Sequence, residues 1–171
     1  MIQQSFMRIF WGLLFVVLDI NLSNIDVIPD FLGYILIYTA LNSLEQFHPQ
    51  FRNAKRFASV MVIVSSAQML HIDPLSISSL LGTALDALMI WHTCTAIADM
   101  ALARGNLSLS EASTERRNLY STIALTNLAV TAFLSISPGS IGVLIIPLVI
   151  ISITVVVLVM MLMRRASIEL G

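Results

Sequence analysis

Residues 141–163 read IGVLIIPLVIISITVVVLVMMLM and are followed by Arg164 and Arg165. The run has no charged side chain, and as a helix it is long enough to cross the hydrocarbon core of a bilayer, which is about 30 Å thick. Arginines directly after such a run are typical of the cytoplasmic face. The stretch therefore predicts a helical membrane protein whose residues after 163 lie on the cytoplasmic side.

The composition of the whole chain favours the same class. Of its 171 residues, 57% are hydrophobic and 11% are charged, whereas soluble domains carry about 25% charged residues. The mean hydropathy is +0.90. The length allows one domain, residues 1–171. Helices are the expected secondary structure, because a backbone in lipid must pair its own polar groups and the runs are too apolar for barrel strands.

Six apolar runs can be marked along the chain. The fourth and sixth reach the length of a full span easily, whereas the first three are short. Their approximate limits are Phe6–Ile20, Val27–Leu44, Phe57–Ile72, Ile77–Ala101, Leu119–Ile136 and Ile141–Met163. We therefore expect an all-α fold, a polytopic bundle of six transmembrane helices arranged as three helical hairpins.

The basic residues predict which side each connection lies on. Cytoplasmic loops are enriched in Lys and Arg, and here the residues of these two types alternate with the apolar runs. They are Arg8 before the first run, Arg52, Lys55 and Arg56 after the second, Arg104, Arg116 and Arg117 after the fourth, and Arg164 and Arg165 after the sixth. The pattern predicts an N-in, C-in layout. A re-entrant first hairpin, residues 1–47, would leave the same charges on the same side.

The three outer connections share a pattern of an acid or hydroxyl, a proline and a later glycine. Asp or Ser can cap the returning helix, Pro is tolerated in its first turn, and Gly lets another helix approach closely. Either helical hairpins converge on this chemistry, or the chain is a three-fold repeat of helix pairs. The residues are Asp26, Pro29 and Gly33, then Asp73, Pro74 and Gly82, then Ser137, Pro138 and Gly142.

The inner connection between residues 104 and 117 contains Ser108-Leu109-Ser110-Glu111. This spacing is that of a capping box, in which Ser begins a helix and Glu bonds back to it. We expect either a short helix along the membrane surface or an extension of the fifth run.

Asp86 is the most unusual residue of the sequence, because it lies well inside the fourth apolar run. Insertion of Asp at a span centre costs about 2.5–3.5 kcal/mol. Its side chain should therefore face the interior of the bundle, be protonated or have a partner. His92 lies deeper on the same helix but points in another direction.

Further candidate ligand-binding residues gather near the outer ends of the runs. They are Asp19, Asp26, Asp30, His71 and Asp73, to which we add Asp86 and His92. Because the first two helices are short, their outer ends could lie below the membrane surface and form an outward-facing acidic recess with Asp86 at its floor. The alternative is that the outer carboxylates are helix caps or lie at the interface.

The sequence favours two functions, and neither requires a cofactor or a resident metal. The first is binding or translocation of a small molecule or cation through the acidic recess, alone or as a transporter subunit. The second is a non-catalytic membrane partner protein for assembly, immunity or regulation, based on small residues and on a polar fifth run suited to helix contacts. No nucleophile–base pair predicts an enzyme, and the scattered basic residues predict no nucleic-acid site.

The stretch Ile25–Ile37, which reads IDVIPDFLGYILI, resembles a segment of uncharacterised small multi-pass membrane proteins of Gram-positive bacteria. Phe10–Phe15, FWGLLF, is similar to the part that precedes it there. The resemblance implies a bacterial cytoplasmic membrane protein and no particular activity. The six-span layout also looks like that of the substrate-capture subunits of energy-coupling-factor vitamin transporters, a likeness of architecture that carries no ligand-binding residue over.

Overall fold

The computed structural model describes residues 1–18, 21–22, 25–26, 30–69, 77–136 and 142–171. Within these residues the chain forms six helices and one two-residue antiparallel ladder. The elements are α1 (Ile2–Leu18), β1 (Asn21–Leu22), β2 (Ile25–Asp26), α2 (Asp30–Leu44), α3 (Pro49–Met69), α4 (Ile77–Ala103), α5 (Leu107–Ile136) and α6 (Gly142–Glu169). The predicted helical class is confirmed.

The ladder between α1 and α2 was not expected from the sequence. Asn21 pairs with Asp26, and Leu22 pairs with Ile25. Backbone groups that have left a helix still need partners. The first outer connection meets this need partly by pairing its two arms with each other.

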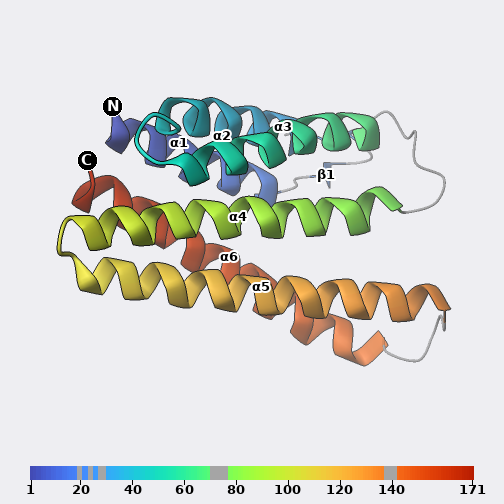
Figure 1. Cartoon of the computed structure of the whole chain (residues 1–171). Helices are drawn as coiled ribbons and strands as arrows, with labels where there is room; N and C mark the ends of the chain where they lie inside the picture. The colour runs from blue at the N-terminus through green and yellow to red at the C-terminus, as the bar shows by residue number, and fades with distance from the viewer. Residues whose placement is uncertain (19–20, 23–24, 27–29, 70–76, 137–141) are drawn as a thin grey trace.

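The helices run alternately in opposite directions. Figure 1 shows both ends of the chain at one end of the bundle, together with the α2–α3 and α4–α5 connections. The last turns of α1, α3 and α5 and the first turns of α2, α4 and α6 lie toward the other end. The basic residues all belong to the first end, which we call the basic end. The alternation inferred from Lys and Arg therefore agrees with the arrangement of the helices.

The six helices form a closed ring in chain order. Each helix packs against the next one in the sequence, and α6 returns to pack against both α5 and α1. Because the ring is closed, side chains from several helices can meet at its centre.

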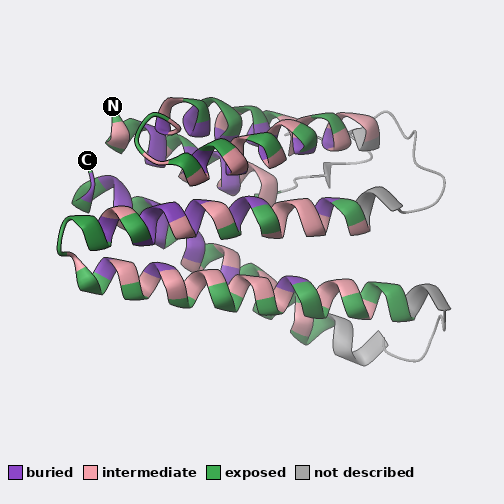
Figure 2. Ribbon diagram, in the orientation of Figure 1, coloured by how far each residue is buried: buried purple, intermediate pink, exposed green. Residues whose placement is uncertain are grey.

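The tightly packed core lies in the half of the ring near the basic end. Fully buried side chains come from the beginning of α1, α3 and α5 and from the end of α2, α4 and α6, and these helix ends all lie there (Figure 2). They include Phe6, Leu44, Phe51, Ile97, Leu109 and Met163. Among the described residues, fewer fully buried side chains come from the other half of the ring.

The first hairpin is held by a contact between two glycines. A Cβ atom added to Gly33 would lie 2.6 Å from the carbonyl oxygen of Gly12, and one added to Gly12 would lie 2.7 Å from that of Gly33. The backbones of α1 and α2 therefore touch, as expected for Gly33. The expectation was wrong for Gly82, where a Cβ would meet, among the described residues, only Met61 Cε at 3.7 Å. The surroundings of Gly142 lie outside the described part.

The turn between α4 and α5 is built on Gly105 and Asn106. Gly105 adopts φ = 74°, and the N–H groups of Gly105 and Asn106 bond to the carbonyls of Leu102 and Ala101. This is the Schellman ending of a helix. Asn106 Oδ1 then accepts the N–H of Leu109 at 3.0 Å and caps α5.

The inner connection is thus an extension of the fifth helix, one of the two alternatives expected. The cap is Asn106, however, and not Ser108. Asn106 also donates to Glu169 at the end of α6 (2.5 Å), which ties this turn to the last helix. The capping-box pattern misplaced the helix start because the residue before α5 already supplied an acceptor.

Two of the helices described here are long and apolar enough to cross a membrane. They comprise Leu80–Ala103 in α4 and Ile146–Glu169 in α6. α1 and α2 have 17 and 15 residues and are short for a span. α3 and α5 are longer, but charged side chains such as Lys55 and Arg117 lie within them.

Candidate functional site

A cavity lies within the ring, next to the tightly packed core. Its volume is about 290 Å³, and side chains from α2 to α6 line it. The polar lining residues are Asp30, Tyr34, Thr83, Asp86, Tyr120, Asn127 and Ser152. Five helices thus contribute to one polar hollow, although most of their other inward-facing residues are apolar.

Asp86 is the residue around which the cavity is organised. The hydroxyl of Tyr34, from α2, donates to Asp86 Oδ1 at 3.2 Å. The hydroxyl of Tyr120, from α5, donates to Asp86 Oδ2 at 3.1 Å. A carboxylate has about four lone-pair positions, so two remain for a ligand in the cavity. The partner expected for a mid-helix Asp is therefore a pair of tyrosines.

Asp30 adds a second carboxylate to the same cavity. It begins α2 and precedes Tyr34 by four residues, so both side chains lie on one face of that helix. Among the described residues that line the cavity, none is Lys, Arg or His. The cavity is thus acidic, and its two carboxylates favour a cation.

The rest of the lining combines a polar pair with apolar side chains. Asn127 Nδ2 donates to Ser152 Oγ at 3.0 Å and joins α5 to α6. Met61, Ile123 and Val155 are among the apolar residues that complete the lining. A ligand in the cavity would therefore meet both acidic and apolar groups.

The structure brings together two of the residues predicted to bind a ligand, Asp86 and Asp30. The other outer candidates, Asp19, His71 and Asp73, lie outside the described residues. Asp26 lies in β2, where the description covers its backbone only. The acidic recess inferred from the sequence is therefore represented here by the cavity with two carboxylates.

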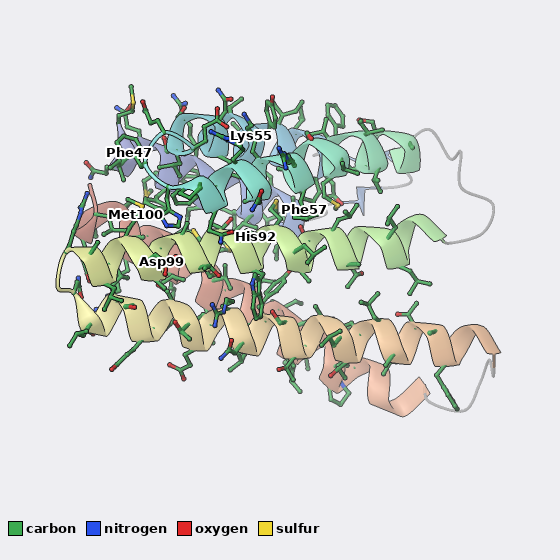
Figure 3. The ribbon with its side chains drawn as sticks, in the orientation of Figure 1. Phe47, Lys55, Phe57, His92, Asp99 and Met100 are labelled. Atoms are coloured by element: carbon green, nitrogen blue, oxygen red, sulfur yellow. The ribbon has the colours of Figure 1, made fainter. Side chains whose placement is uncertain are left out.

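His92 lies away from the cavity, on the side of α4 that faces α3. Its Nδ1 lies 2.6 Å from Gln50 Oε1, which makes Nδ1–H the donor. Its ring stacks on that of Phe57, with 5.6 Å between centroids, and Figure 3 shows the two side by side. Within the described lining, His92 does not contribute to the acidic cavity. Its contacts are those of a packing residue between α3 and α4.

The sequence reasoning did not identify Tyr34, Tyr120, Thr83 or Ser152 as site residues. Tyr34 carried one usable signal, its four-residue spacing from Asp30. Tyr120 is the lone tyrosine of the fifth helix. Its contact with Asp86 joins residues 34 positions apart, which no local spacing reveals.

The described residues contain no group of three His, Cys, Asp or Glu side chains placed to hold a metal ion. The single cysteine, Cys94, is buried in the core. The acidic cavity therefore remains the candidate site, and its chemistry is that of a carboxylate with phenol donors.

Comparisons with family models, with curated proteins and with solved structures find no match to this chain.

Proposed function

We propose that this chain is an integral membrane protein whose acidic cavity binds a small organic ammonium ion, for capture or transport across the membrane. The observation that carries the proposal is Asp86, held by two tyrosines at the wall of a cavity. A carboxylate within an apolar helix is costly unless it has a role or a partner. Asp86 has two hydrogen-bond partners, the tyrosines, and it also lines a cavity.

The surface of the bundle supports a membrane location for all six helices. Ile63, Leu125 and Ile150, from α3, α5 and α6, are 69%, 67% and 60% exposed. Such side chains are unfavourable in water but favourable against lipid. The apolar exterior extends to helices whose mean hydropathy is reduced by charged side chains in their first halves, as in α3 and α5.

The arginines beside the two tryptophans support the orientation with the basic end in the cytoplasm. Trp91 lies under Arg117, with Cζ 4.4 Å from the ring centroid. Trp11 follows Arg8 by three residues on α1. Trp is enriched at the membrane interfaces and Arg on the cytoplasmic side. Both tryptophans thus lie close in sequence or space to arginines of the basic end.

The lengths of the helices support access from the outer side. α2 has 15 residues and is about 22 Å long at 1.5 Å per residue, against a hydrocarbon core of about 30 Å. α5 and α6 have 30 and 28 residues. Asp30, at the outer end of the short α2, would then lie below the outer surface and at the cavity wall.

The size and lining of the cavity favour a small organic cation. Ligand sites usually measure about 300–1,000 Å³, and this cavity, about 290 Å³, lies at the lower limit. The apolar part of the lining favours a ligand that carries carbon atoms as well as a charge. The charge of an ammonium compound would bind Asp86 and Asp30, and its carbon skeleton would contact apolar residues such as Val155.

The proposal is tested with the full chain purified in detergent. Its thermal unfolding is followed with methylammonium, choline and putrescine, and with sodium chloride at equal ionic strength. A ligand at one hundred times its dissociation constant stabilises by about 2.7 kcal/mol. We expect at least one ammonium compound to raise the unfolding temperature of the wild type, and Asp86→Asn to abolish that rise.

Asp99→Asn is the matched control, since Asp99 lies on the same helix but pairs with His48 at 3.5 Å near the basic end. It should keep the ligand response. Equal responses of the Asp86→Asn variant and the wild type would contradict the proposal, as would a wild type indifferent to all three compounds.

The alternative function, a membrane partner protein, has less support from the fifth helix than its composition suggested. Thr122 and Thr126 are exposed on α5, but their hydroxyls bond to the carbonyls of Asn118 and Thr122 in the same helix. They do not need a second protein to complete their hydrogen bonds.

A further inference from the structure

A second hollow lies on the outside of the bundle, between α4 and α5. Its volume is about 350 Å³, and its lining is almost wholly apolar. The residues that shape it include Ala84, Ala87, Leu88, Trp91, Leu125 and Leu128. Leu88, Trp91 and Leu125 are 43%, 39% and 67% exposed, so the hollow is an outer groove and not part of the core. We call it the α4–α5 groove.

An arginine lies at one end of this groove. The guanidinium of Arg117 stacks over Trp91, 4.4 Å from Cζ to the ring centroid, and Nη1 donates to Thr95 Oγ1 at 3.2 Å. These contacts fix the charge beside the ring that forms the groove wall. Among the described residues, the ion pairs are His48–Asp99, Lys55–Glu45 and Arg165–Glu169, so none neutralises Arg117.

Arg117 and the α4–α5 groove lie one after the other along the axis of α5. Ser121 lines the groove and lies one turn after Arg117, to whose carbonyl its hydroxyl donates at 2.8 Å. Leu128 lies two further turns away from the basic end. The groove thus begins beside a cationic group at the basic end and continues over apolar residues toward the opposite end.

This arrangement matches the polarity of a phospholipid in the leaflet at the basic end. A phosphate would lie beside Arg117, and the acyl chain would run along the groove away from the basic end. Basic residues at a membrane surface attract anionic lipids by about 1 kcal/mol each. The small side chains of Ala84 and Ala87 leave room for a chain between the flanking leucines.

We propose that the α4–α5 groove binds one acyl chain of an anionic glycerophospholipid, with the lipid phosphate on Arg117. The site rests on the membrane location proposed above but not on the ammonium site, because the two hollows differ in lining and chemistry. The groove combines an apolar channel with an arginine that has no carboxylate partner among the described residues. This combination favours an anionic lipid as the ligand.

Native mass spectrometry of the detergent-purified full chain tests this proposal. Phosphatidylglycerol and phosphatidylcholine with identical acyl chains are titrated against the protein. We expect phosphatidylglycerol to bind about tenfold more tightly, which corresponds to about 1.4 kcal/mol. Arg117→Gln should reduce its affinity to that of phosphatidylcholine, whereas Arg117→Lys should retain most of the difference.

Arg104→Gln is the matched control. Arg104 is an exposed cation at the same end of the bundle, and it lies 13 residues, or about 20 Å, from Trp91 along the helical path. Its removal should leave the preference unchanged. Ala87→Phe, which fills the groove, should weaken the binding of both lipids.

Three results would overturn the proposal. The first is equal affinity of the wild type for the two lipids. The second is an equal loss of preference in the Arg104→Gln and Arg117→Gln variants. The third is a protein dimer that Ala87→Phe dissociates, which would assign the groove to a second copy. The Arg117→Gln variant should still respond to ammonium compounds as the wild type does. A failure of the lipid site can therefore be distinguished from a failure of the ammonium site.

Discussion

At the scale of single residues, Asp86 connects the stability of the bundle with its proposed chemistry. Its two oxygens accept hydrogen bonds from helices on both sides, at 3.2 and 3.1 Å. The same carboxylate therefore joins α2, α4 and α5 and presents charge to the cavity. A residue that serves both purposes cannot be replaced by an apolar one without the loss of both.

We predict that Tyr34→Phe and Tyr120→Phe each destabilise the protein by about 1–2 kcal/mol, because each leaves one oxygen of a largely enclosed carboxylate without its donor. Water in the cavity replaces part of the loss. Thermal unfolding in detergent measures the effect. Tyr38→Phe is the control, since Tyr38 is exposed on the same helix. If Tyr38→Phe lost as much stability, the hydrogen bonds to Asp86 would not explain the destabilisation of the other two variants.

The sequence predicted Asp86 but not its partners, and the reason is physical. A carboxylate in an apolar run is anomalous wherever the helix packs, so composition alone identifies it. Tyrosine is common at interfaces, in cores and in binding sites. Whether Tyr34 and Tyr120 meet Asp86 depends on how α2, α4 and α5 are rotated about their axes, which the sequence does not specify.

At the scale of elements, the hairpins are built by different contacts, although their sequences look alike. In the first hairpin, Gly12 and Gly33 bring two backbones together. Gly82 has no such neighbour. The recurrence of glycine at comparable positions therefore did not predict a recurrent contact, because a close approach needs a small residue on both helices.

Gly33→Ala is expected to destabilise the protein by about 1–3 kcal/mol, the usual cost of forcing atoms into a packed interface. The added Cβ would lie 2.6 Å from the carbonyl oxygen of Gly12, which cannot move without shifting α1. Unfolding midpoints of purified variants would report the change.

Gly82→Ala provides the comparison in the same measurement. Alanine favours a helix over glycine by about 1 kcal/mol, and the added Cβ meets only a flexible methionine end at 3.7 Å. This variant should be as stable as the wild type or more so. If both variants lost stability equally, close packing of α1 on α2 would not explain the first.

At the scale of the whole molecule, the charge pattern predicted the alternation of the helices but not their order around the ring. The positions of Lys and Arg assign each connection to one end of the bundle, along the helix axes. They do not indicate which helices are neighbours in the plane perpendicular to those axes. That α6 returns to α1 became apparent only from the packing, and the cavity that this closure creates could not be predicted without it.

The orientation can be tested through single cysteines, because native Cys94 is buried and should give a low background. We predict that a membrane-impermeant maleimide labels Asn24→Cys, Ser76→Cys and Ser140→Cys in intact cells. Leu107→Cys, at the exposed first residue of α5, should be labelled only after the membrane is opened. Asn24→Cys reports on the first hairpin, for which a re-entrant path is the alternative.

Labelling of Leu107→Cys in intact cells would reverse the proposed sidedness. Protection of Asn24→Cys, with labelling at the other two outer positions, would instead show that the short first hairpin does not reach the outer surface. In each case, the extent of labelling after permeabilisation confirms that the introduced thiol is reactive.

The closure of the ring by α6 also has a consequence for the order in which the protein is made. Synthesis supplies α1 to α5 first, and until α6 follows, α1 and α5 each have one flank without the helix that later covers it. Ser152 and Val155 belong to α6. A chain without α6 would therefore have a cavity that lacks one wall. If the cavity binds the ligand proposed above, binding would report that α6 has joined the ring.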